Sequence, residues 1–69
     1  MNDNVLSETC DPADAVLQNG SIESGEQDRY VYGDTIKFIC NENFVLQGNN
    51  FIRCLGSEFS SAVPTCIGL

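Results

Sequence analysis

The sequence predicts a small all-β, disulfide-rich domain with little or no helix, and three observations support this fold class. The chain has only 69 residues, so its core buries too little apolar surface to offset chain entropy comfortably, and a covalent staple is expected. It contains four cysteines and no histidine. Its apolar residues alternate with polar ones in several short segments bounded by Gly, Asn, Asp and Pro, which is typical of strands joined by turns.

The four cysteines favour two disulfides over a metal site. They are Cys10, Cys40, Cys54 and Cys66, each far from the next along the chain. Zinc sites are built from close pairs of ligands that grip a tetrahedral ion, and this chain has neither such pairs nor histidine. We therefore expect no metal and no cofactor. Disulfides persist in oxidising compartments, so we expect a secreted protein or the extracellular face of a cell surface.

The domain is expected to span residues 10–66, from the first cysteine to the last. Residues 1–9 are mostly polar and lack periodicity, which predicts a linker or a disordered N-terminus. Residues 67–69 would then be a C-terminal tail. No apolar run is long enough to span a bilayer or to act as a signal peptide, so we expect a fragment of a larger precursor.

The first segment of the domain is expected to be extended. Asp11 precedes a proline, which pushes its backbone out of the helical region. Residues 13–18 are compatible with one helical turn, but the segment is short and ends at Asn19-Gly20, so we prefer a strand followed by a tight turn. Asn19 also begins an Asn-Gly-Ser sequon and is a candidate glycosylation site; the alternative is turn chemistry alone.

Residues 22–28, IESGEQD, are polar and acidic, which predicts an exposed, mobile loop. A rigid scaffold presents partner contacts on such loops, so Glu23, Glu26 and Asp28 are candidate contacts. The alternative is a tolerant loop without function. The aromatic residues are mostly assigned to the core, and the burial of Tyr32 and Phe51 is the least secure; Tyr32 is taken as a fourth candidate contact.

The stretch from residue 30 to residue 48, YVYGDTIKFICNENFVLQG, is the centre of the predicted fold. Ile36, Phe38 and Cys40 fall at every second position, which predicts a strand with one buried face and Cys40 pointing into the core. Residues 41–43 predict a turn.

Two more strands are expected after that turn. Phe44 and Leu46 resume the alternation. Beyond a turn at residues 49–50, residues 51–54 are expected to form another strand, with Phe51 and Arg53 on one face and Ile52 and Cys54 on the other. The segment 63–66, Val-Pro-Thr-Cys, then closes the domain.

Charge and composition restrict the function. Three basic and ten acidic residues give a formal net charge of −7, which disfavours nucleic acid, heparin-like polyanions and anionic lipid as partners. A local basic patch would require Arg29, Lys37 and Arg53 to converge. The chain has no histidine and no free thiol once its cysteines pair, so we expect no enzyme. Carboxylate pairs such as Asp11 and Asp14 are interpreted as solvated surface charge.

Several residues occur between the cysteines in an order that is specific for one family. They are Asn19-Gly20, Tyr30, Gly33, the run Ile36-Lys37-Phe38-Ile39-Cys40, Phe44-x-Leu46-x-Gly48, Gly56, and Pro64-Thr65-Cys66. With these features the chain resembles a sushi domain, also called a complement control protein (CCP) module or short consensus repeat. The resemblance covers residues 10–66.

The resemblance implies an elongated, antiparallel, β sandwich-like module with two disulfides. Four cysteines permit three pairings, and the resemblance implies the first with the third and the second with the fourth: Cys10–Cys54 and Cys40–Cys66. The family usually has Trp between the last two cysteines, whereas this chain has no Trp, and Phe59 is expected to be the core aromatic in its place.

For function, the resemblance implies an extracellular protein-binding module from a larger complement-regulatory or immune/adhesion protein. Its partner would be an extracellular protein, such as a complement component or receptor, and neighbouring sushi domains would flank it. Direct membrane insertion is not expected. Two alternatives stay open: a structural spacer between domains, and an accessory module of a secreted protease or a pathogen surface protein.

Overall fold

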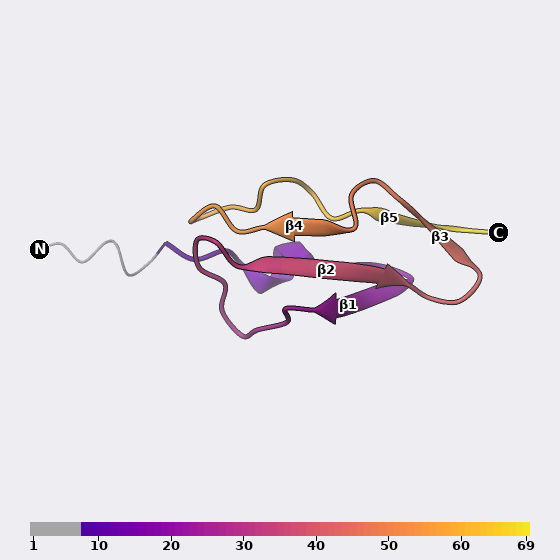
Figure 1. Cartoon of the computed structure of the whole chain (residues 1–69), viewed down its shortest axis with the longest axis horizontal. Coiled ribbons are helices and arrows are strands. Elements are labelled where there is room, and N and C mark those ends of the chain that lie inside the picture. Colours follow the sequence, from indigo (N-terminus) through magenta and orange to yellow (C-terminus); the bar gives the residue numbers. More distant parts are fainter. Residues whose placement is uncertain (1–7) are drawn as a thin grey trace, which may run out of the picture.

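The computed structural model describes residues 8–69, so most of the expected N-terminal linker lies outside the described residues. The elements are a 3-10 helix and five strands: η2 (Pro12–Ala15), β1 (Gly20–Ser24), β2 (Thr35–Cys40), β3 (Phe44–Gln47), β4 (Phe51–Arg53) and β5 (Thr65–Gly68). The strands form two antiparallel sheets, β1-β2-β4 and β3-β5. The sheets follow one another along an elongated molecule (Figure 1). The predicted all-β fold is confirmed.

The central strand, β2, has the two faces that its alternation predicts. Ile36 and Phe38 are buried, while the residues between them are exposed. Ile36 lies directly opposite Ile52 of β4, and both side chains have no exposed surface. Cys40, at the end of the strand, is half-buried and packs against the core.

The second sheet is formed by β3 and β5. The register places Leu46 opposite Cys66 and Phe44 opposite Gly68. An added Cβ at Gly68 would lie 3.3 Å from the ring of Phe44, so the two strands are in close contact there. β5 ends at Gly68, so two of the three residues expected as a C-terminal tail pair within this sheet.

The core is a single cluster of buried apolar residues and cysteines, to which both sheets contribute. Its members are Cys10, Ala15, Leu17, Tyr30, Ile36, Phe38, Ile52, Cys54 and Cys66. Because a domain of this size has so few core residues, each buried side chain accounts for a large share of the apolar burial.

The preferred interpretation of residues 13–18 as a strand is wrong for the first half of that segment. Residues 12–15 form η2, because Pro12 provides a helical φ at its start and the Asp11 carboxylate accepts a hydrogen bond from the N–H of Ala13 at 3.0 Å. The backbone becomes extended only at Val16. Asp11 is thus a helix cap in addition to a surface charge.

The expected loop 22–28 is also shorter than predicted. Its first three residues belong to β1, and Ile22 is half-buried against the core opposite Phe38. The register shifts between Ile22 and Ser24. Such an irregularity bends an edge strand, and it marks the point where the strand gives way to the connection.

Candidate interaction surface

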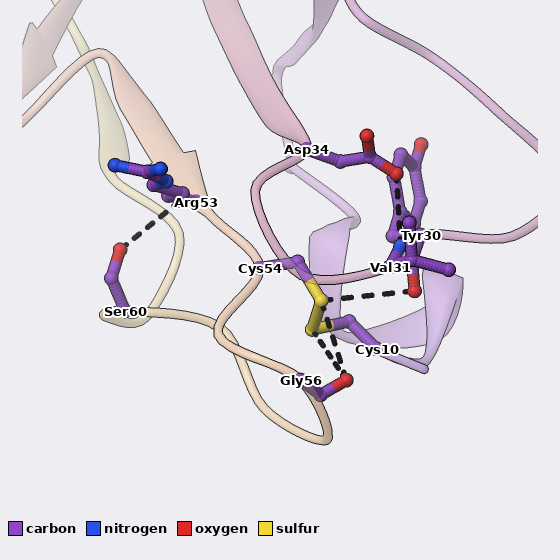
Figure 2. Close-up of a disulfide and its surroundings, with 8 residues drawn as sticks. All are labelled: Cys10, Tyr30, Val31, Asp34, Arg53, Cys54, Gly56 and Ser60. Carbon is purple, nitrogen blue, oxygen red and sulfur yellow. Dashed lines mark hydrogen bonds between the residues drawn. A yellow bond between two sulfur atoms is a disulfide. The ribbon is translucent and has the colours of Figure 1, made fainter. Parts of the chain in front are cut away.

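The first disulfide, Cys10–Cys54, is fully buried at one end of the three-stranded sheet. The N–H of Cys10 donates a hydrogen bond to the carbonyl oxygen of Tyr30 at 2.8 Å. The carbonyl oxygens of Tyr30 and Gly56 lie 3.5–3.7 Å from the disulfide sulfurs (Figure 2). This disulfide ties the start of the domain to the end of β4.

The second disulfide, Cys40–Cys66, joins β2 to β5 and therefore links the two sheets. The pairing implied by the sushi resemblance, first to third and second to fourth, is confirmed by both bonds. The two loops that they close overlap along the chain. All four cysteines are paired.

Tyr30 connects the core to the surface loop that precedes it. Its side chain is 1% exposed, and its ring meets that of Phe59 edge-on, with ring centroids 5.7 Å apart and planes at 64°. Phe59 is half-buried and packs against the core beside Tyr30. The hydroxyl of Tyr30 accepts a hydrogen bond from the N–H of Gln27 at 3.0 Å. The buried ring therefore anchors an exposed segment.

We call residues 25–29 the acidic loop, because they contain Glu26 and Asp28, both exposed. The loop is held to the domain at two points. Gly25 has a φ of 89°, and a Cβ there would clash with the carbonyl oxygen of Thr35. Gln27 donates to Tyr30 as described above. The predicted exposure is present, and these two contacts fix the path of the backbone.

Residues 31–34 form the Tyr32 turn, which is separated from the acidic loop only by Tyr30. The Asp34 carboxylate accepts a hydrogen bond from the N–H of Val31 at 2.8 Å, and the N–H of Asp34 donates to the carbonyl of Val31 at 3.0 Å. The N–H of Gly33 donates to the carbonyl of Cys54 at 2.9 Å. Tyr32 lies within this braced turn with 69% of its surface exposed.

The outward face of the three-stranded sheet combines charge with apolar surface. Lys37 lies opposite Phe51, which is 52% exposed, and Arg53 follows two residues later on the same strand. Lys37 forms an exposed ion pair with Glu23 of β1, with 3.8 Å between Nζ and Oε1. Exposed pairs of this kind contribute little stability. Two of the three bases named in the sequence analysis thus share a face, and Arg29 lies in the acidic loop.

The four candidate contacts are placed as follows. Glu23 lies on β1 in its ion pair, Glu26 and Asp28 lie in the acidic loop, and Tyr32 lies in the adjoining turn. Sequence reasoning named Phe51 as an insecurely buried aromatic and Lys37 and Arg53 as possible members of a basic patch, but did not combine them into one surface. The outward-facing half of the alternating pattern in β2 and β4 was the signal that could have found them.

Among residues 8–69, no group of three or more His, Cys, Asp or Glu side chains is arranged to hold a metal ion. Within the same part of the chain, no helix is long and apolar enough to cross a membrane.

The paired sheets, the overlapping disulfides and the exposed connection between β1 and β2 define a small disulfide-stabilised β module. The family model described as Sushi repeat (SCR repeat) matches residues 10–66. The chain belongs to this family.

Most of the curated relatives carry names from the complement system. The chain is similar to the C4b-binding protein alpha chain of Rattus norvegicus, with 40% identity over 48 residues, which is 70% of this chain and 9% of the relative. It is 46% identical over 44 residues to complement factor H of Bos taurus, covering 64% of this chain and 4% of that protein. It is 40% identical over 51 residues to human complement receptor type 2, covering 72% of this chain and 5% of the receptor. The chain thus spans a small fraction of each relative.

Proposed function

We propose that this chain is a protein-binding module of an extracellular complement-regulatory or immune/adhesion protein. Family membership and the names of the relatives support this proposal: one is named for binding C4b, and another is named a complement receptor. None of these names denotes an enzyme. Each relative is many times longer than the matched segment. The proposal therefore concerns binding by this module alone and not the activity of a whole protein.

The observation that carries the proposal is the exposed Tyr32 on a braced turn. Exposed tyrosines are enriched among residues that dominate binding energy, since they bury a large area with few rotatable bonds. The hydrogen bonds of Val31, Gly33 and Asp34 hold the turn in one conformation. Little conformational entropy is then lost when a partner binds.

Charge supports the choice of partner surface. Glu26 and Asp28 lie on the connection that leads to Tyr32, together with Arg29, and Glu23 precedes them on β1 in its ion pair with Lys37; the whole molecule has a net charge of −7. A complementary basic surface on the partner would be steered toward this side and would associate faster at low ionic strength. We therefore propose a protein partner with basic residues, a complement component or receptor, and not nucleic acid or a polyanion.

The proposal places the module outside the cell, on a secreted or cell-surface protein with neighbouring sushi domains. The two disulfides support this location, because such bonds persist in oxidising compartments. The name of one relative, the GPI-anchored complement decay-accelerating factor of Mus musculus, also agrees with a cell-surface location.

A capture experiment tests the proposal. The oxidised domain is immobilised and exposed to serum and to cell-surface extract, with a reduced and alkylated copy as the control. We expect complement proteins among those that only the oxidised domain retains. Retention of another receptor or adhesion protein would keep the binding function and reject complement. Equal retention by both copies would reject specific recognition by the folded module.

A structural spacer is the second candidate, favoured by the path of the chain. The described chain starts near one end of the long axis and finishes at the other (Figure 1). Such a module holds its neighbours apart at a fixed separation. Replacing it in the parent protein by an unrelated sushi domain would preserve function if it is a spacer, and would abolish partner binding if the recognition proposal is correct.

A further inference from the structure

The turn that holds the Asn19-Gly20-Ser21 sequon has a fixed position. The carbonyl oxygen of Asn19 accepts a hydrogen bond from the N–H of Asn41 at 2.8 Å. An added Cβ at Gly20 would lie 3.0 Å from the sulfur of Cys66 and closer still to its other neighbours, so only glycine fits. The turn is therefore packed directly against the Cys40–Cys66 disulfide.

The two sequon residues that the glycosylation machinery recognises, Asn19 and Ser21, are both exposed. Asn19 is exposed and has a φ of 62°, a left-handed conformation that asparagine tolerates better than most residues. Ser21 is exposed on β1. The folded domain thus leaves room for a substituent on the Asn19 amide without displacing any core residue.

A groove of about 480 Å³ includes Asn19 in its wall. Residues 16–19 form one side and residues 63–66 form the other. Val16, 64% exposed, and the half-buried Val63 provide apolar surface, while the exposed Gln18 and Thr65 provide hydrogen-bonding groups. A pyranose ring has apolar C–H faces and a hydroxyl rim, so this mixed lining suits a sugar.

We propose that Asn19 carries an N-linked oligosaccharide whose first N-acetylglucosamine lies in this groove. The amide nitrogen of Asn19 attacks the anomeric carbon of a polyisoprenyl-pyrophosphate-linked oligosaccharide. A carbon–nitrogen bond forms, the bond from that carbon to the pyrophosphate oxygen breaks, and the amide loses one proton as the lipid pyrophosphate leaves. The inference rests on the secretory route that is part of the proposed function.

The glycan would leave the proposed contact surface free. The groove adjoins the Cys40–Cys66 disulfide, whereas the Tyr32 turn is hydrogen-bonded beside Cys54 of the other disulfide. A sugar in the groove also shields Val16 from non-specific contact. The module would then have one covered face and one face open to a partner.

Expression behind a signal peptide in cultured animal cells tests the modification. The secreted and retained fractions are both examined by intact mass, before and after peptide N-glycosidase treatment, which removes the glycan and converts Asn19 to aspartate. Two variants at the same exposed position are the controls: Ser21→Thr keeps the sequon and Ser21→Ala removes it. We expect a glycan on the wild type and on Ser21→Thr, and none on Ser21→Ala.

Disulfide-bonded wild-type chain without the sugar would overturn the proposal and leave the binding function intact, since partner capture is measured separately. The position of the sugar has its own readout. After the glycan is trimmed to its first sugar, we expect nuclear Overhauser effects from that sugar to the methyl groups of Val16 and Val63. Effects confined to Asn19 would overturn the placement in the groove.

Discussion

The buried hydroxyl of Tyr30 accepts a hydrogen bond from the backbone N–H of Gln27, a residue whose own side chain is exposed. The bond crosses from the core to the acidic loop. It explains how a segment of polar residues without regular secondary structure keeps a defined path. This oxygen atom is one of the two points that hold the loop, the other being the close approach of Gly25 to the carbonyl of Thr35.

Tyr30→Phe removes that oxygen and retains the ring that packs on Phe59. We expect a loss of about 0.5–1.5 kcal/mol in the free energy of unfolding, the usual net contribution of one hydrogen bond. The amide of Gln27 should exchange its hydrogen faster. Urea unfolding and hydrogen exchange measure the two effects. Tyr32→Phe, which alters an exposed hydroxyl, is the control and should change neither.

The two disulfides should differ in their contribution to stability. On the loop-entropy model, closing loops with sequence separations of 44 and 26 stabilises by about 4 and about 3.5 kcal/mol. Cys10 and Cys54 are also more deeply buried than Cys40 and Cys66. Replacing the first pair by alanine should therefore cost more than replacing the second, as measured by thermal unfolding. A larger loss from the second pair would contradict this ranking.

Gly25 and Gly33 both have positive φ values, 89° and 98°, but their surroundings differ. A Cβ at Gly33 would meet nothing within 4 Å, whereas one at Gly25 would clash with the carbonyl of Thr35. Gly33→Ala should cost about 1–2 kcal/mol through backbone strain alone. Gly25→Ala should cost about 1–3 kcal/mol more, because the backbone must also move. Equal losses in chemical denaturation would show that the loop is not held at Gly25.

The sequence predicted the fold where side chains alternate and failed where contacts are distant. The burial of Ile36 and Phe38 follows from period-two spacing, which can be recognised within a short segment of sequence. β5 was missed because its pairing with β3 depends on residues about twenty positions away, which no local pattern reveals. η2 was missed because Asp11 was considered as a residue before proline and as a surface charge, and not as a helix cap.

For the candidate contacts too, local sequence predicted some features, while features that depend on distant contacts were missed. The exposure of Glu26 and Asp28 was predictable from the polar composition of their segment, whereas Tyr32 was only one of two aromatic residues whose burial was uncertain. The attachment of the acidic loop through Tyr30 was not predictable, because the sequence does not show whether the hydroxyl of a buried tyrosine forms a hydrogen bond. The disulfide pairing required knowledge of a family, since four cysteines alone leave three choices.

Charge reversal in the acidic loop should weaken binding to the protein captured in serum or extract. Glu26→Lys with Asp28→Lys is expected to lower the association rate, most strongly at low salt, because exposed charges act mainly on encounter. Glu42→Lys, which reverses an exposed charge in the turn between β2 and β3, is the matched control. Association rates that are equal for all variants would reject the acidic loop as a contact.

The most direct measurement of the central claim is the equilibrium affinity of the Tyr32→Ala domain for its captured partner. Tyr32 has no core role, so unfolding should be unchanged while affinity falls at least about tenfold, or about 1.4 kcal/mol. Val45→Ala, at an exposed apolar residue on β3 of the other sheet, should bind like the wild type. Full affinity of Tyr32→Ala, with the wild-type fold retained, would contradict the proposed recognition surface.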